Sequence, residues 1–314
     1  MIKKYILNFS VILILINTAE GKLSNFPFTE HKSLFQVAGI GKNDDENNWS
    51  GGHWNPVTKT IYFCRNKWGI RSFKYHEDKK GKYFSLDKNL EFIPHKKHDF
   101  ESITQSDLNS QIVWVINENE NKLEEYDLSS ASPKLVSEWS VGKLVAKNTS
   151  FEGLVFVPNS YLQKYNFKDG EGHAYEKAES GRSGIFLLSD QRSGIIYGLD
   201  LGKDGKVNVI GSYKLPLGST RALDLDYESG YLFALDGKKF AAFTLNSKKD
   251  DSGEADRKFE VKKLFKSPGP ESVEGLAVIS NLDKKTISFM VTDDDNFKNT
   301  AIRWYEVERD LIFK

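Results

Sequence analysis

The feature that most constrains the fold of this chain is a pattern that recurs five times at intervals of about fifty residues. In each copy a polar or charged residue stands at the start of a short hydrophobic run. These five residues, called the anchors below, are Ser50, Glu101, Glu152, Arg221 and Glu274. Successive anchors are 51, 51, 69 and 53 residues apart. A period of this length is typical of a chain built from equal structural units.

Within each repeat, the residue types indicate short β-strands separated by turns. A second hydrophobic run begins eleven residues after each of the first two anchors, at Ile61 and Ile112. The residues in between, such as 55–59, include Asn, Pro and Thr, which favour chain reversals. Third and fourth runs follow, for example at 123–128 and 135–139. Four short strands of β-branched and aromatic residues per unit are typical of a β-propeller blade.

We therefore predict an all-β fold, a five-bladed β-propeller that occupies residues 22–314 as one domain. Six blades are the fallback if residues 22–48 contain a further partial unit. The last repeat has three clear strands, and the candidates for its fourth are 309–313 and 33–38. An N-terminal strand that pairs into the last blade would close the ring and remove two exposed sheet edges. A doubly wound α/β fold is disfavoured because no long segment has helical periodicity.

The composition fits this fold and narrows the set of partners. The chain has 314 residues, of which 39% are hydrophobic and 13% aromatic, and this suits one compact all-β domain. The 44 basic and 44 acidic residues balance, so we expect no nucleic-acid partner. We expect a monomer that binds a small molecule or a protein whose identity the sequence does not give.

The first 21 residues have the pattern of a secretory signal peptide. Two lysines precede an apolar stretch at 5–16, and small residues follow it near Gly21. An uncleaved anchor is the alternative, although the apolar stretch is short for a membrane span. We therefore expect a secreted, extracellular protein with no stable membrane span after cleavage. Its sequons at Asn48 and Asn148 could carry glycans.

Strand direction places the anchors on one face of the ring. In a four-stranded blade, the connection that enters the innermost strand and the connection between strands two and three lie on the same side. Because the innermost strands lie nearest the axis, the anchors should converge at the mouth of the central channel. The connections between strands two and three should surround them with polar residues, namely Asn117, Asp190, Asp236 and Asp293.

Three anchor carboxylates near one axis repel one another unless a positive charge lies among them. One solution is a hard divalent cation, most simply calcium, bound by carboxylate and amide oxygens. The metal ligands would then be Glu101, Glu152, Glu274 and Asp293, and the other ligand-binding candidates are Ser50, Arg221, Asn117, Asp190 and Asp236. A second solution is Arg221, whose guanidinium can bridge two carboxylates. A third needs no ligand, because each glutamate could cap backbone N–H groups of the neighbouring blade.

The blade openings resemble those of the SdiA-regulated propeller family. The resemblance is carried by Phe-Glu-Gly-Leu at 151–154 and Asp-Phe-Glu-Ser-Ile at 99–103, each followed by a strand that ends in Ser-Asp or Asn-Glu. It runs through blades two, three and five, and is weak in blades one and four, where Ser50 and Arg221 replace the acidic residue. The resemblance implies a five-bladed propeller behind an N-terminal membrane or export segment, often linked to calcium. Phytase-like esterase propellers and gluconolactonase propellers have similar openings, and in the latter a Glu and amide or Asp side chains hold the metal.

Two classes of function follow from these observations. The first is a secreted propeller that binds a ligand or a partner, since the chain has no nucleophile elbow, no phosphate-binding glycine loop and no His-Glu-x-x-His motif. The alternative is a metal-dependent hydrolase of an ester, lactone or phosphoester, in which the ion would polarise the substrate or activate water. The long insert at 161–183 should lie on the face away from the anchors.

Overall fold

The computed structural model describes residues 23–27, 29–30, 49–66, 69–79, 81–87, 98–130, 132–144, 150–268, 273–280, 285–293 and 302–313. Most of the regular structure in these ranges is β-strand. The helices among them are α2 (Asn159–Lys164), α3 (Arg309–Phe313) and the short 3-10 helix η2 (Gly142–Leu144). No helix in this part of the chain is long and apolar enough to cross a membrane.

The described strands form five four-stranded antiparallel units, and each unit begins at one of the five sequence repeats. Blade one contains β2 (Trp49–Asn55), β3 (Thr60–Arg65), β4 (Gly69–Asp78) and β5 (Gly81–Leu86). Blade two contains β6 (Phe100–Thr104), β7 (Ile112–Asn117), β8 (Lys122–Asp127) and β9 (Lys134–Ser140). Blade three contains β10 (Phe151–Pro158), β11 (Gly184–Asp190), β12 (Ile195–Leu201) and β13 (Val207–Lys214).

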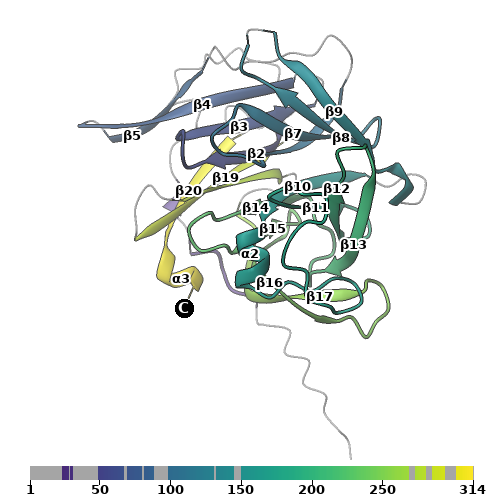
Figure 1. Ribbon diagram of the computed structural model, residues 1–314. Helices are drawn as coiled ribbons and strands as arrows, with labels where there is room; N and C mark the ends of the chain where they lie inside the picture. The colour runs from purple at the N-terminus through teal and green to yellow at the C-terminus, as the bar shows by residue number, and fades with distance from the viewer. Residues whose placement is uncertain are drawn as a thin grey trace, which may run out of the picture.

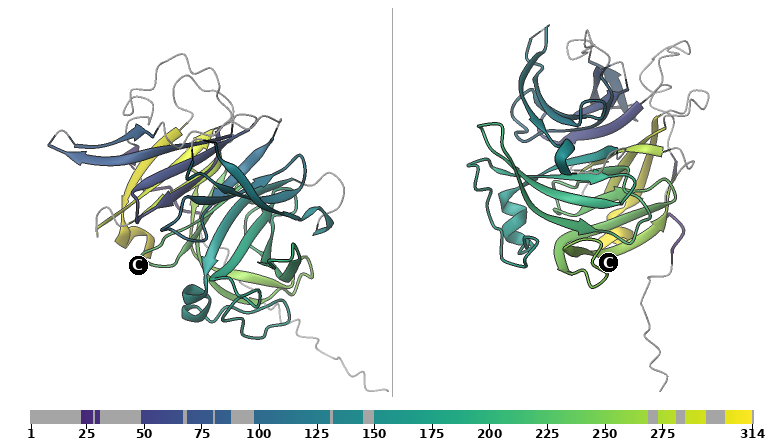
Figure 2. Two further views of the ribbon diagram at one scale, coloured as in Figure 1. Left: turned by 45° about the horizontal axis from the view of Figure 1, so that its top comes forward. Right: turned by 90° about the vertical axis from the view of Figure 1, so that its right-hand side faces the viewer.

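Blade four contains β14 (Ala222–Leu225), β15 (Leu232–Leu235), β16 (Lys239–Lys249) and β17 (Arg257–Lys266). Blade five contains β18 (Val273–Ile279), β19 (Thr286–Asp293), β20 (Ile302–Glu308) and the N-terminal β1 (Thr29–Glu30). The outermost strands of blades three and four, β13 and β17, also pair in parallel over two residues and join these blades into one eight-stranded sheet. The blades lie around a common centre, with β2, β10 and β14 near the middle and β5, β9 and β13 at the outside (Figures 1 and 2). This arrangement is a β-propeller, as the repeats predicted.

The hydrophobic core is divided into five buried clusters, and each cluster lies between two neighbouring blades. In ring order from the junction of blades one and two, the clusters contain Tyr62 with Ile103, Trp114 with Phe156, Val155 with Leu223, Leu235 with Leu276, and Ile279 with Trp54. The last cluster joins blade five to blade one, so side-chain packing closes the ring. Successive residues of β10 serve opposite junctions because side chains alternate along a strand.

Hydrophobic residues just after the anchors fill these junctions, as expected from the sequence. The six residues predicted to lie between blades are at most 1% exposed, and they are Leu154, Phe156, Leu223, Leu225, Leu276 and Val278. The first two belong to the cluster between blades two and three. Each blade therefore depends on its neighbours for the burial of its faces, and the ring is stable only as a whole.

The ring is also closed by hydrogen bonds at its N-terminal segment, as predicted, although not by the expected residues. Thr29 and Glu30 lie opposite Glu306 and Tyr305 of β20, so β1 is the fourth strand of blade five. The segment 33–38, which we expected in this place, lies outside the described residues. The alternative at 309–313 was wrong, because these residues form α3. The edge of β20 is already occupied by β1, and the chain turns away from the sheet there.

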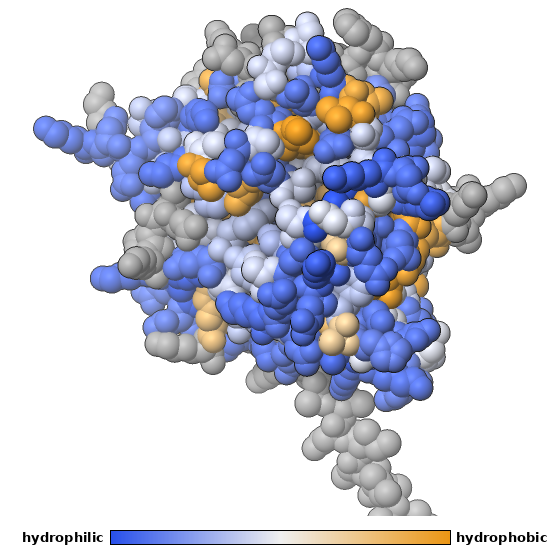
Figure 3. Space-filling view, in the orientation of Figure 1, coloured by the Kyte–Doolittle hydropathy of each residue, from blue (hydrophilic) through white to orange (hydrophobic). Residues whose placement is uncertain are grey.

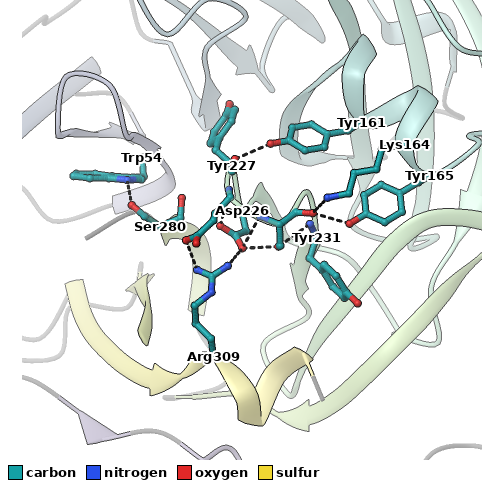
Figure 4. Close-up of polar contacts among 11 residues, drawn as sticks. Trp54, Tyr161, Lys164, Tyr165, Asp226, Tyr227, Tyr231, Ser280 and Arg309 are labelled. Atoms are coloured by element: carbon teal, nitrogen blue, oxygen red, sulfur yellow. Dashed lines mark hydrogen bonds and ion pairs between the residues drawn. The ribbon is translucent and has the colours of Figure 1, made fainter. Parts of the chain in front are cut away.

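The long insert after β10 packs against the face opposite the anchors, as predicted. Helix α2 begins it, and Tyr161 Oη donates a hydrogen bond of 2.7 Å to the carbonyl oxygen of Tyr227 in the turn between β14 and β15 (Figure 4). The Lys164 and Tyr165 side chains both bond the Ser229 carbonyl oxygen of the same turn at 2.7 Å. Arg309 of α3 reaches this turn too, with Nη2 2.7 Å from Asp226 Oδ2. The turn is thus held from two sides.

Candidate metal centre

Four of the five anchors lie in irregularities of the innermost strands. In blades one, two, three and five the pairing register shifts at the anchor, between Trp49 and Gly52 in β2 and between the corresponding residues of β6, β10 and β18. A β-bulge of this kind turns a side chain out of the regular alternation of the strand. In blade four, Arg221 directly precedes β14. The repeated bulge is the local device that directs the anchor side chains toward the channel mouth.

The structure brings the three anchor glutamates together. Carboxylate oxygens of Glu101, Glu152 and Glu274 all lie within 4.8 Å of one another, although the residues come from three different blades. Glu101 and Glu152 are only 4% and 6% exposed. Three acidic groups are therefore held close together in a region largely withdrawn from water.

The direct partners of these carboxylates satisfy them only in part. Ser50 Oγ donates a hydrogen bond to Glu101 Oε2 at 3.0 Å, and Arg221 Nη1 lies 3.4 Å from Glu274 Oε1. Ser150 Oγ reaches Glu152 Oε1 at 3.4 Å. The other oxygen, Glu152 Oε2, is buried and has no hydrogen-bond partner. Arg221 therefore pairs with one anchor carboxylate and leaves another with an unsatisfied oxygen.

Two further carboxylates extend this cluster, and sequence reasoning did not single them out. Oxygens of Asp99 and Glu118 lie within 4.8 Å of each other and of Glu101. Asp99 stands two residues before the anchor of blade two, and Glu118 follows β7 in the connection between strands two and three. Both positions lie on the predicted anchor face, so the signal was present. We call the five residues Asp99, Glu101, Glu118, Glu152 and Glu274 the acidic cluster.

Burial and mutual repulsion raise the pKa values within the acidic cluster. The pKa of Glu101 lies well above its usual range, first because of burial and then because of Glu152, Asp99 and Glu118 nearby. Burial, followed by the charges of Glu274 and Glu118, raises the pKa of Glu152 to about 8, against the lowering effect of Arg221. Burial and Asp99 also raise the pKa of Glu118. Each of these carboxylates therefore keeps its proton to a higher pH than an exposed carboxylate does, unless a cation replaces the proton.

Side chains other than the anchors accept hydrogen bonds from backbone N–H groups of neighbouring blades. Leu154 N donates to Ser102 Oγ at 3.0 Å, and Val278 N donates to Asp224 Oδ2 at 2.7 Å. The hydrogen bonds described for Glu101 and Glu152 go instead to serine hydroxyls. The alternative in which each anchor glutamate caps the backbone of the next blade therefore does not describe these two residues.

Two of the outer candidates, Asp190 and Asp236, form hydrogen bonds within turns of the chain. Asp190 accepts hydrogen bonds from Ser193 Oγ at 2.6 Å and from the Arg192 backbone at 3.1 Å, so it caps its own turn. Asp236 likewise accepts a bond from the backbone of Lys238 at 2.8 Å. Short polar side chains commonly stabilise turns in this way.

The remaining candidates are Asn117, Asp293 and Ser50. Asn117 is fully buried, with Nδ2 2.8 Å from Glu124 Oε1 and 2.9 Å from His98 Nδ1. Asp293 ends β19, and its side chain lies outside the described residues. Ser50 Oγ also contacts Asn66 Oδ1, so its one hydroxyl proton can go either to Asn66 or to Glu101. Of the nine predicted site residues, the described contacts connect five, namely Ser50, Glu101, Glu152, Arg221 and Glu274.

Comparison with known proteins finds similar solved structures but no matching family and no curated relative. The resemblance to the SdiA-regulated family therefore stays a prediction. Among solved structures, the chain is similar to the glutaminyl cyclase of Myxococcus xanthus, at 10% identity and a TM-score of 0.45 over 83% of this chain and 90% of that one.

Two other solved structures are similar to this chain to a comparable degree. A chain of a nidogen/laminin complex is 12% identical with a TM-score of 0.40, over 82% of this chain and 83% of that one. The WD40 propeller domain of Doa1 is 11% identical with a TM-score of 0.39, over 80% and 62% of the two chains. Likenesses of this size say nothing about a ligand or an activity.

Proposed function

We propose that this protein is a secreted calcium-binding β-propeller that captures a ligand or partner at the mouth of its central channel. The cation would be bound by Glu101, Glu152 and Glu274. The observation that carries this proposal is Glu152 Oε2, a buried carboxylate oxygen without a hydrogen-bond partner, within a group of three carboxylates whose oxygens lie within 4.8 Å. An unpaired buried carboxylate is costly, and a cation at this point would remove the cost.

The chemistry of the cluster favours a hard cation. All of the candidate ligand atoms are carboxylate oxygens, and the nearby Ser50 and Ser150 add hydroxyl oxygens. Calcium accepts six to eight oxygen ligands in irregular geometry, whereas magnesium demands a near-ideal octahedron. A site assembled from three blades suits the less demanding ion. Calcium also fits the export that residues 1–21 predict, because extracellular calcium is abundant.

Burial of the cluster favours binding over hydrolysis. With Glu101 and Glu152 at most 6% exposed, the carboxylates that would hold the ion present little surface to a substrate. A bound ion would still offer its remaining coordination positions to oxygen donors of a ligand at the channel mouth. The alternative, hydrolysis of an ester, lactone or phosphoester, requires calcium-dependent turnover. It can be tested with p-nitrophenyl acetate and p-nitrophenyl phosphate in calcium and in chelator.

The direct test is thermal unfolding of the purified protein in millimolar calcium and in excess chelator. A ligand that binds only the native state at 100 times its Kd stabilises it by about 2.7 kcal/mol, which for a domain of this size is a shift of roughly 4–5 °C. Glu152→Gln keeps the shape of the side chain and removes one charge, so it should reduce the shift severalfold. Glu171→Gln, whose side chain is 84% exposed in the insert on the opposite face, is the matched control and should keep it.

The outcomes separate the alternatives clearly. A wild-type melting temperature that is the same in calcium and in chelator would end the cation proposal and leave Arg221 and proton uptake to neutralise the cluster. An equal shift in wild type and Glu152→Gln would mean that calcium binds elsewhere on the molecule. Measurement of bound calcium per chain by elemental analysis gives the stoichiometry independently of stability.

A further inference from the structure

A second group of buried polar side chains lies deeper in the propeller than the acidic cluster. His53 of β2 and Asp224 of β14 each stand three residues after an anchor, so they lie roughly 10 Å further along their strands. They belong to blades one and four, which are not neighbours in the ring. Even so, His53 Nδ1 lies only 3.7 Å from Asp224 Oδ1. The two side chains therefore meet across the central channel.

Tyr227 and Ser280 complete this group. The Tyr227 ring packs edge-on against the His53 ring, with centroids 5.9 Å apart. In Figure 4, Tyr227 points away from Asp226 and Arg309, and its carbonyl oxygen is held by Tyr161. Ser280 follows β18, and its carbonyl oxygen accepts a bond from Trp54 Nε1 at 3.0 Å, which ties it to the strand that carries His53 (Figure 4). We call His53, Asp224, Tyr227 and Ser280 the lower-channel group.

The polar atoms of this group lack protein partners to an unusual degree. His53 Nδ1 and Nε2, Tyr227 Oη and Ser280 Oγ are all buried, and none has a hydrogen-bond partner. His53 is 0% exposed and Ser280 is 1% exposed. The 3.7 Å between His53 and Asp224 is too long for a direct hydrogen bond. Asp224 uses its other oxygen, Oδ2, to accept a bond from Val278 N.

The unpaired ring nitrogens of His53 lie beside Asp224, the Tyr227 ring packs on the same histidine, and Ser280 is joined to β2 through Trp54, so these buried atoms point to a bound molecule rather than to chance. Each buried donor or acceptor that stays unpaired costs about 1–3 kcal/mol, so a group of four would be a large burden on the fold. The molecule that pairs them must both donate and accept, because a ring nitrogen, a carboxylate and two hydroxyls surround it. One histidine and one carboxylate are fewer ligands than a protein-bound zinc or calcium ion normally has. Full enclosure by tightly packed strands admits only a very small molecule.

We propose that the lower-channel group is an internal hydration site, in which ordered water joins His53, Asp224, Tyr227 and Ser280. Water supplies donors and acceptors in any order and forms two to four bonds in such sites. It thereby links blade one to blade four across the axis, where no backbone pairing connects them. The site contains no residue of the acidic cluster, so a positive or negative result for calcium binding does not bear on it.

A crystal structure at about 1.5 Å resolution is the first test. We expect density for ordered water within hydrogen-bond distance of His53 Nε2 or Tyr227 Oη, with a contact to Asp224 Oδ1 or Ser280 Oγ. Direct hydrogen bonds among the four side chains, with no density between them, would overturn the proposal.

Thermal unfolding of Tyr227→Phe is the second test. If water bonds Tyr227 Oη, loss of the hydroxyl should lower the melting temperature by several degrees. Tyr213→Phe gives the size of decrease to expect in the melting temperature, because it removes a direct hydrogen bond of 2.7 Å to the Lys168 carbonyl oxygen. If the site is dry, removal of an unpaired hydroxyl should leave the melting temperature unchanged or raise it. Ser280→Ala should likewise lower the melting temperature if water is bound, and leave it unchanged or raise it if the site is dry. This second variant serves as the test should Tyr227→Phe fold poorly.

Discussion

At the scale of single residues, the acidic cluster shows how position decides the chemistry of a carboxylate. Asp190 and Asp236 lie in turns, where backbone N–H groups and hydroxyls satisfy them. Glu101 and Glu152 lie in bulges of innermost strands, where burial and other carboxylates surround them. The same functional group is a turn cap in the first place and a candidate ion ligand in the second.

The raised pKa of Glu152 predicts how the stability of the metal-free protein depends on pH. Its pKa of about 8 in the fold exceeds the value of about 4.3 expected in the unfolded chain. Between these values the native state binds more protons than the unfolded state, so the free energy of unfolding should fall as the pH rises from about 5 to about 8. Denaturant unfolding in chelator at several pH values measures this.

Glu152→Gln supplies the control for this pH dependence. The variant lacks the titrating group, so its stability should fall less steeply over the same range. Millimolar calcium should flatten the wild-type curve, because the ion replaces the protons. A wild-type stability that rises between pH 5 and pH 8 in chelator, or an identical slope in the variant, would contradict the assignment.

At the scale of strands, the glycine that follows several anchors explains how the innermost strands come together. A Cβ atom at Gly275 would collide with the carbonyl oxygen of Ser50 and the hydroxyl of Thr292. Thr292 Oγ1 also donates a 2.6 Å hydrogen bond to that carbonyl oxygen. The Glu-Gly-Leu motif therefore joins a candidate ion ligand, a point of close approach and a core residue in three successive positions.

Replacement of Gly275 by alanine should weaken the junction of blades five and one. The added methyl group forces β18 away from β2, and overpacking of this kind costs roughly 1–3 kcal/mol of unfolding free energy. Gly218→Ala is the control, because a Cβ atom there would meet nothing within 4 Å. Chemical denaturation of both variants measures the difference. Equal stabilities would show that the two strands can separate without cost.

At the scale of the whole molecule, the N-terminal segment fastens two blades at once. Ser24 forms backbone hydrogen bonds with Leu264 and Lys266 of blade four, at 3.3 and 3.0 Å. The ring of Phe26 lies 5.0 Å from that of Phe240 and 6.2 Å from that of Tyr305, between blades four and five. The chain then pairs with β20. The face of the molecule seen in Figure 3 is mostly hydrophilic, with separate hydrophobic patches.

Removal of residues 1–30 should therefore destabilise the whole propeller rather than one edge of it. The truncated chain would expose the edge of β20 and the aromatic residues under Phe26, and exposed edges promote association. We expect a melting temperature lower by several degrees and a tendency to aggregate, measured by thermal unfolding and light scattering. A chain that begins at residue 22 is the control. Unchanged stability after removal of residues 1–30 would show that side-chain packing alone closes the ring.

Some of this could be predicted from the sequence because the signals are local or periodic. Alternation of apolar residues depends on neighbours two positions apart, and the fifty-residue repeat reports that one unit is used again. These two signals were sufficient for the propeller, for the packing of Leu154 and Leu276 between blades, and for the face on which the insert lies. They also brought Glu101, Glu152 and Glu274 to one place, because equivalent positions in a ring share a distance from its axis.

Other features depend on contacts between residues far apart in the chain, and only the tertiary structure decided them. His53 meets Asp224 across the channel, and neither residue has a local signal for this contact. The fourth strand of blade five includes Thr29–Glu30, because these residues reach the edge of β20 in the folded chain. The pKa of Glu152 and the unpaired atoms of His53 depend on burial. Burial exists only once distant strands have packed together, so no local sequence signal reports it.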